Sequence, residues 1–380
     1  MATRLGCLVA APALALLVGC GGAGVSPMGN DGSSPSDTVV VEPPLPTLAT
    51  ADVVARRLAA MIWDGEPDGA LVSELKAAPI SREAVGGIAD RMLGDPRARR
   101  GMTAFFGHWL LLLPEANPEP GSLLASMQQE APALGMYLTV DSAGTLADLL
   151  QAPYTFVDET LARHYGLTDV SGPAFRKVPY PAGQPRVGVL SGAGMLSHYS
   201  SLLPSGPSWP AKRSWMVTDP LLCTPIIRSF LPSIVPDVSR SIRQQMIDAT
   251  ANGTCMACHA YLNSPGFAFI GFDVKGIWHP EPGAAANETQ GWIPDKIMPD
   301  APTFEGPASL AQLLANRDET RRCYVRQWMQ YAIDRKDITI DIPEDQRASI
   351  EVALRAFAAS GYRLRAAIVA VAQSNPVLRP

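Results

Sequence analysis

Apolar side chains recur at the period of a helix over much of this chain. In residues 51–64 they occupy Val53, Val54, Leu58, Met61 and Ile62, a spacing that places them on one face of a helix. The same kind of pattern predicts helices over residues 68–75, 81–93, 97–113, 146–164, 241–251, 307–333 and 346–373. Strand patterns are confined to short pieces at 175–178 and 187–190. We therefore expect a mainly α fold whose helices are joined by long Pro-rich loops.

The amino-terminal residues have the pattern of an export signal rather than of a folded element. Arg4 precedes an apolar run from Leu5 to Val18, which is too short to span a membrane comfortably. The run ends in Leu17-Val18-Gly19-Cys20, which is typical of a bacterial lipoprotein signal, and this predicts lipidation of Cys20. An ordinary signal peptide with an incidental cysteine is the alternative.

Export and lipidation together predict a location. Residues 21–47 are rich in Gly, Ser, Pro and Asp and are expected to form a flexible linker. No later segment approaches 20 uninterrupted apolar residues. We expect a protein anchored by lipid in the bacterial cell envelope. Gly21, where an Asp would favour the inner membrane, points to the outer membrane, facing the periplasm or the cell surface.

The run Cys255-Met256-Ala257-Cys258-His259 carries the clearest chemistry. Two thiols at this spacing can form thioethers with the vinyl groups of one porphyrin, and the histidine that follows can bind the iron as proximal ligand. The motif predicts one covalent haem c on Cys255, Cys258 and His259. A zinc half-site, a redox dithiol and a structural disulfide are the alternatives, but no second CxxC or HxxxH supplies further zinc ligands.

The other cysteines can be assigned by elimination. The chain has six, of which Cys7 belongs to the signal and three are the lipidation and haem candidates. Cys223 and Cys323 remain, and leftover thiols in an oxidising compartment most often pair. We expect a disulfide between them; two buried free cysteines are the alternative.

The second axial ligand of the iron has several candidates. Met298 precedes Pro299 in a loop after the motif, and a His/Met pair raises the reduction potential. A buried or exposed loop methionine with no bond to the iron is the alternative. His279 is the second choice, because a second histidine lowers the potential, and His198 is the third. A sixth position that is open would permit peroxide or small-gas chemistry.

Composition and the remaining polar residues exclude some classes. The net charge of −5 and the absence of a basic run argue against nucleic-acid binding. No Gly-rich phosphate loop or nucleophile elbow occurs. Asp158-Glu159 is an acidic pair in an apolar setting, for which a helix cap is commoner than catalysis. His108 and His164 have apolar neighbours and are expected to pack as structural residues.

Several segments together resemble three linked domains of unknown function, families 1592, 1588 and 1585, from exported proteins of planctomycetes and myxobacteria. The first domain is carried by Leu58–Trp63, Arg91–Arg97, Phe105–Leu110, Tyr154–Glu159, Leu161–Gly166 and Arg186–Leu190. The second is carried by Cys255–His259 and Leu262–Phe269, and the third by Phe304–Gly306, Cys323 and Tyr331–Arg335. The resemblance implies domains over residues 48–200, 201–295 and 296–380.

The family is regarded as cytochrome-like because of its cysteine motif, and this chain departs from the pattern at three positions. Asp248 stands where relatives have a histidine before the motif, Ile270 stands where they have Glu, and His279 or a neighbour stands where they have Arg. The resemblance therefore implies a helical haem domain that follows a multi-helix domain, while the roles of those polar residues are in doubt.

The sequence thus predicts a membrane-anchored monohaem protein that carries electrons to or from a redox partner protein, and is an electron carrier rather than a catalyst. The large helical domain before the motif is expected to dock that partner. The alternatives are a peroxidase-like haem enzyme with an open sixth site, and a haem-free surface or partner-docking protein with a structural CxxC.

Overall fold

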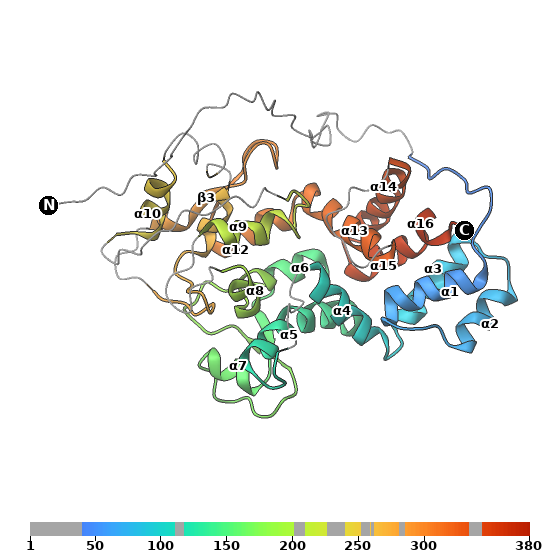
Figure 1. Ribbon diagram of the computed structural model, residues 1–380, viewed down its shortest axis with the longest axis horizontal. Helices are drawn as coiled ribbons and strands as arrows, with labels where there is room; N and C mark the ends of the chain where they lie inside the picture. The colour runs from blue at the N-terminus through green and yellow to red at the C-terminus, as the bar shows by residue number, and fades with distance from the viewer. Residues whose placement is uncertain are drawn as a thin grey trace, which may run out of the picture. The chain divides into compact units, whose positions relative to one another are not determined.

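A computed structural model describes residues 40–110, 118–200, 210–225, 240–251, 259, 262–280, 286–333 and 344–380. Residues Val39–Pro380 form one compact unit. The fold is mainly helical, as predicted, and the described residues include two antiparallel sheets of two short strands each (Figure 1).

The predicted helices of the first part are confirmed. They are α1 (Ala51–Leu58), continued by a π-helical turn over Ala59–Trp63, then α2 (Gly69–Ala77), α3 (Arg82–Leu93) and α4 (Ala98–Trp109). The side chains of Asp68 and Ser81 accept hydrogen bonds from the backbone N–H groups of Leu71 and Ala84. These N-caps satisfy donors that have no partner within the helix.

Two features between residues 120 and 180 differ from the sequence prediction. The helix α5 (Leu123–Met136) contains Pro132 and was not predicted. Residues 146–164, predicted as one helix, form α6 (Leu146–Gln151), strand β1 (Tyr154–Val157) and α7 (Glu159–His164). Pro153 separates α6 from β1, and the residue before a proline is disfavoured in helical geometry. β1 pairs with β2 (Arg176–Pro179), which confirms the strand predicted at 175–178.

In the middle of the chain, the strand predicted at 187–190 is wrong. Gly188 has φ +45°, and a 3₁₀ turn follows at Val189–Ser191. The helices α8 (Ala193–His198), α9 (Pro210–Thr218) and α10 (Ile242–Ala249) follow, the last as predicted. A 3₁₀ helix at Pro265–Phe269, called η4, precedes the hairpin of β3 (Gln290–Trp292) and β4 (Thr303–Glu305).

The two long helices predicted at the end are each broken into two. The first is α12 (Gly306–Ala315) followed by α13 (Asp318–Ile333), and the second is α14 (Glu344–Ala359) followed by α15 (Leu364–Ala372). Gly361, with φ +73°, lies between α14 and α15 in the left-handed conformation that commonly ends a helix. A short helix, α16 (Asn375–Leu378), ends the chain.

Aromatic side chains join the first and last parts of the chain into one core. The ring of Phe105 on α4 stacks on Trp328 of α13, with centroids 3.5 Å apart and planes 12° from parallel. Trp109 lies 5.1 Å from Tyr324, whose ring is 5.5 Å from Phe357 on α14. In Figure 1, α1 and α3 likewise lie beside α16 and α15. Helices from opposite ends of the sequence therefore share a single hydrophobic cluster.

The folded part has defined contacts upstream of Leu48. Glu42 is 7% exposed, its carboxylate pairs with Arg82, and it accepts a hydrogen bond of 3.0 Å from the backbone N–H of Asn375. The carbonyl of Pro43 accepts a second hydrogen bond from the side chain of Asn375. The start of the folded part is thus attached to α16 at the end of the chain.

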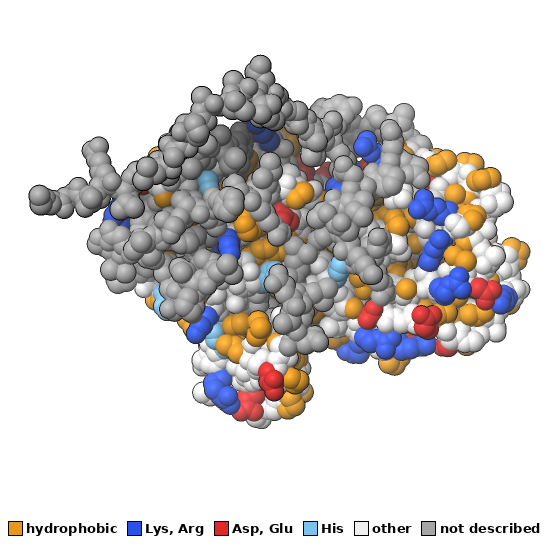
Figure 2. Space-filling view, viewed as in Figure 1, with side chains coloured by type: hydrophobic (Ala, Val, Ile, Leu, Met, Phe, Trp, Pro, Cys, Tyr) orange, Lys and Arg blue, Asp and Glu red, His pale blue; other side chains and the backbone are white. Residues whose placement is uncertain are grey.

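Charges of both signs alternate on the surface over α1 to α4 (Figure 2). Three of the ion pairs there are Lys76–Asp52, Arg91–Glu74 and Arg99–Asp141. No helix in the part of the chain that the structure describes is long and apolar enough to cross a bilayer.

A disulfide joins Cys223 to Cys323, as predicted. The sulfur atoms are 2.06 Å apart and the Cα atoms 5.4 Å apart. Cys323 lies on α13, and the indole N–H of Trp109 on α4 donates to the carbonyl of Pro220 at 2.7 Å. The segment that follows α9 is therefore attached to both helices that hold the aromatic core.

Replacing Cys223 and Cys323 together by Ser is expected to lower the free energy of unfolding by about 2–5 kcal/mol, because the bond closes a long loop in the unfolded chain. Denaturant unfolding of the variant and the unreplaced protein measures the difference. Adding a reductant should destabilise the unreplaced protein and leave the double variant unchanged; equal stability of the two proteins would contradict the structural role.

Candidate functional site

His259 is the described member of the haem-type motif. Cys255 and Cys258 lie outside the described residues, as does Cys20. The imidazole of His259 is buried, with 3% of the residue exposed. The backbone N–H of Asn263 donates to the carbonyl of His259 at 3.0 Å, a helical turn that places the two side chains on one face.

Asn263 sets the orientation of the His259 ring. Nδ1 of His259 lies 3.1 Å from Oδ1 of Asn263. The amide of Asn263 donates through Nδ2 to Oγ1 of Thr250 at 3.3 Å, and the hydroxyl of Thr250 donates to the carbonyl of Met246 at 2.7 Å. Because each donor in this chain meets an acceptor, Oδ1 of Asn263 faces the ring and Nδ1 carries the proton. The lone pair is then on Nε2.

The helix α10 positions Thr250 at its C-terminal end. Ser241 caps the helix by accepting from the N–H of Gln244, and the N–H of Thr250 returns to the carbonyl of Met246. Asp248, which the resemblance set where relatives are expected to have a histidine, pairs with Arg240 and accepts from Gln244 at 2.7 Å. Hydrogen bonds from these two side chains lower the pKa of Asp248. Its carboxylate is thus engaged on the exposed side of α10.

The segment after His259 is attached to the β3–β4 hairpin. The hydroxyl of Ser264 donates to the carbonyl of Trp292 at 2.8 Å and accepts from its N–H at 2.7 Å. A Cβ on Gly291 would lie 2.5 Å from the carbonyl oxygen of Ser264, so this position admits only glycine without a shift of the backbone. The loop of this hairpin contains Met298, which is fully buried and donates its N–H to Pro294 at 2.9 Å.

A buried arginine holds the segment that follows η4. Arg213, on α9, is 1% exposed and donates to the carbonyls of Phe269 at 2.8 Å and Phe272 at 2.7 Å, and also to that of Asp273. Burial lowers the pKa of Arg213 to about 9, so the guanidinium stays charged at neutral pH. The cation is stabilised by backbone carbonyls, which are thereby fixed in place.

The other histidines occupy different settings. The side chain of His279 is 59% exposed and its Nε2 lies 3.0 Å from a carboxylate oxygen of Asp273. His198 is exposed at the end of α8. His164 lies 3.0 Å from the carbonyl of Lys275, and burial lowers its pKa. His108 lies against the ring of Tyr331, with centroids 5.6 Å apart. His164 and His108 are both half-buried against neighbouring residues, which agrees with the packing predicted for them.

The acidic pair Asp158-Glu159 is structural, as predicted. Asp158 caps α7 by accepting from the N–H of Leu161 at 2.8 Å, and its other oxygen accepts from Ser126 at 2.7 Å. Glu159 accepts from the N–H of Gly172 at 2.8 Å and pairs with Arg163. Both carboxylates are occupied by the fold itself.

A buried carboxylate, that of Glu130, lies on α5, a helix that the sequence pattern did not predict. Glu130 accepts hydrogen bonds from Thr155 at 2.9 Å and Tyr165 at 2.6 Å through Oε1, and from the N–H of Gly194 at 3.0 Å through Oε2. Burial raises the pKa of Glu130. Its partners lie on β1, just after α7 and on α8, so the group joins these elements to α5.

Comparison with known proteins gives three matches of family models along the chain. Residues 50–167 match "Protein of unknown function (DUF1592)", residues 186–281 match "Protein of unknown function (DUF1588)" and residues 300–377 match "Protein of unknown function (DUF1585)". The families and their order are those of the resemblance. Residues 186–190, which the resemblance placed in the first domain, fall within the second match.

No curated protein and no solved structure matches the chain. The three matches follow one another without overlap, and His259 lies in the second of them. The chain therefore belongs to the proteins that combine the domain families DUF1592, DUF1588 and DUF1585 in this order.

Proposed function

We propose that this protein is a monohaem c-type electron carrier of the bacterial cell envelope. Cys255 and Cys258 would hold the porphyrin through thioethers, and Nε2 of His259 would bind the iron as proximal ligand. A bound haem supplies an iron that accepts and returns one electron. The protein sets the potential through the axial ligands and burial, and provides the surface on which a redox partner protein docks.

The hydrogen bond from Nδ1 of His259 to Asn263 is the observation that carries this proposal. A histidine that binds a metal through one ring nitrogen usually donates the N–H of the other to an oxygen, which fixes the tautomer and makes the ligand more basic. The chain from His259 through Asn263 to Thr250 supplies this arrangement with matching donors and acceptors. Any buried histidine needs a partner for its N–H; what supports the proposal is that this partner engages Nδ1, in a residue that directly follows the cysteine pair, and so leaves the lone pair of Nε2 for the iron.

Met298 is the best-supported candidate for the second axial position. It is fully buried, and its loop belongs to the hairpin that is hydrogen-bonded to Ser264, five residues after His259. Burial keeps a thioether away from water, and a His/Met pair favours the ferrous state. His279 ranks second, because its side chain is exposed and already engaged with Asp273.

Lipidation of Cys20 would place the folded part outside the cytoplasm, where haem is attached to such motifs. The linker from residue 21 would hold that part off the outer membrane. This location fits the disulfide between Cys223 and Cys323, since disulfides persist in oxidising compartments.

The mature chain, expressed with the haem-attachment machinery, is expected to gain the mass of one haem and to show a sharp reduced α band. Replacing Cys255 and Cys258 together by Ala should abolish both signals, because the thioethers cannot form. Protein mass under denaturing conditions and the reduced absorption spectrum measure this. The variant His279→Ala serves as a matched control and should retain full haem content.

Absence of covalent haem from the unreplaced protein would reject the electron-carrier proposal and favour a haem-free docking protein.

The variant Asn263→Leu separately tests whether Asn263 orients the ring of His259. It should keep the covalent haem and raise the reduction potential, since His259 becomes a weaker electron donor without its acceptor. An unchanged potential would remove Asn263 from the site.

Replacing Met298 by Ala is expected to convert a low-spin iron with two protein ligands into a high-spin one, and to lower the potential. Absorption and magnetic circular dichroism spectra of the ferric protein measure the change, and Met298→His should restore a low-spin spectrum. If the unreplaced protein is already high-spin, the sixth position is open and a peroxidase-like enzyme is favoured; if only His279→Ala changes the spectrum, His279 is the ligand.

Replacing Cys20 by Ala should release the protein from the membrane fraction, because the folded part would lose its acyl anchor. Fractionation of cells and mass analysis of the mature amino terminus provide the measurement. The variant Cys7→Ala, within the signal, should leave the anchor intact. Membrane attachment that survives in the Cys20 variant would contradict lipidation at this residue.

A further inference from the structure

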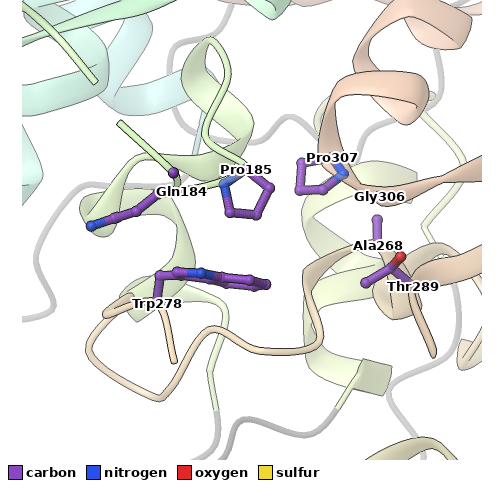
Figure 3. Close-up of a pocket in the computed structure, with 8 residues that line it drawn as sticks. Gln184, Pro185, Ala268, Trp278, Thr289, Gly306 and Pro307 are labelled. Atoms are coloured by element: carbon purple, nitrogen blue, oxygen red, sulfur yellow. The ribbon is translucent and has the colours of Figure 1, made fainter. Parts of the chain in front are cut away.

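A cavity of about 410 Å³ lies between residues 183–185, two residues of the second family segment and the start of α12 in the third (Figure 3). Its volume is within the range of about 300–1,000 Å³ that is typical of small-molecule sites. In Figure 3 the indole of Trp278 lies flat beneath Pro185, with Ala268 and Thr289 across from it and Pro307 above them. The residues that line the cavity are Gly183, Gln184, Pro185, Ala268, Trp278, Thr289, Gly306 and Pro307.

The turn that carries Trp278 is rigidly built. One carboxylate oxygen of Asp273 accepts from the N–H groups of Lys275 at 2.9 Å and Ile277 at 2.8 Å, and the N–H of His279 returns to the carbonyl of Gly271 at 2.8 Å. The ring of Phe272 packs 5.0 Å from the indole. Gly271 has φ +96°, and a Cβ there would overlap the indole of Trp278. The indole is thus held in one position by its own turn.

Arg186 connects this turn to Gln184, which lies on the same side of the cavity in Figure 3. Its Nε donates to the side-chain oxygen of Gln184 at 2.6 Å, and Nη2 donates to the carbonyl of Gly276. Nη1 donates to the carbonyl of Ser191 at 2.6 Å, so the buried guanidinium is fully engaged with the protein. The segment of Gln184 and the turn of Trp278 are therefore fixed relative to each other, so this side of the cavity is preformed.

The chemistry of the lining selects a neutral ligand. None of the eight lining residues carries a charge, and the nearby cation of Arg186 is taken up by three protein oxygens. The indole N–H of Trp278 and the hydroxyl of Thr289 have no hydrogen-bond partner among the described residues. Thr289 lies near Gly306, whose missing side chain leaves the cavity open at the start of α12.

We propose that this cavity binds one hexopyranose ring of a neutral carbohydrate. Such a ring has an apolar face of C–H groups that can stack on an indole, and a rim of hydroxyls that can pair with Thr289 and the indole N–H. A nucleotide also stacks on aromatic rings but brings phosphate charge, for which the lining has no cation. The assignment is independent of the haem proposal.

Isothermal titration of the mature full chain with cellotetraose, maltotetraose and mannotetraose tests the assignment. We expect saturable binding of at least one of them, weakened at least about tenfold by Trp278→Ala, since the stacking surface is lost. Trp292→Ala is the matched control, because Trp292 is also partly exposed (38%) and does not line the cavity. It should bind as the unreplaced protein does.

Thr289→Val keeps the shape of the side chain and removes its hydroxyl. It should bind several-fold more weakly than the unreplaced protein while its unfolding midpoint and haem content stay the same; this variant decides the matter if Trp278→Ala fails to fold. The proposal is overturned if none of the three oligosaccharides binds at about 10 mM. It is equally overturned if a folded Trp278→Ala protein, or Thr289→Val, binds with unchanged affinity.

Discussion

The stack of Phe105 on Trp328 is the contact on which the rest of the structure depends. It joins α4, from the first family segment, to α13, from the third, and makes them parts of one core. The same helix α13 holds Cys323, whose disulfide with Cys223 attaches the chain that follows α9. The helix α9 in turn packs on η4, directly after His259. Three families that are recognised separately in sequence are thus physically one body, and the candidate haem segment is supported by both of its neighbours.

Within that body, the candidate site is defined by the direction of its hydrogen bonds rather than by their number. The one hydroxyl hydrogen of Thr250 is donated to a helix carbonyl, so its oxygen accepts from the Asn263 amide N–H, and Asn263 then presents its oxygen to the ring of His259. The order of donors begins at the C-terminal end of α10, where the carbonyl of Met246 accepts both the backbone N–H and the hydroxyl of Thr250. A proton on Nδ1 follows from this order, and a free lone pair on Nε2 follows from the proton. Thr250, at the end of the helix before the motif, therefore sets through Asn263 which ring nitrogen of His259 is left to bind a metal.

The elements whose formation depends on neighbouring residues could be predicted from the sequence, and those that depend on contacts with distant residues could not. The caps at Ser81 and Asp158 and the helical period of residues 241–251 depend only on neighbouring residues, and the disulfide was predicted by assigning the other four cysteines to other roles. The helix α5 was missed because Pro132 resembles a breaker; Glu130 on that helix is stabilised by donors from three other elements, which no local pattern records. The strand at 154–157 was read as helix because its partner lies 20 residues away. Asn263 stands four residues after His259, a spacing that could have indicated the contact.

The two buried arginines show why the segment after the motif is so firmly placed. A guanidinium loses much solvation energy on burial, and Arg213 and Arg186 recover it chiefly from backbone carbonyls. An apolar replacement would spare the desolvation and leave those carbonyls unpaired, at about 1–3 kcal/mol each. The arginines therefore fix the backbone path rather than a partner side chain. Residues 269–273 lead from η4 to the turn of Trp278. Arg213 binds the backbone of the first of these parts and Arg186 binds that of the second. The two cations therefore hold both the segment after His259 and one side of the cavity in place.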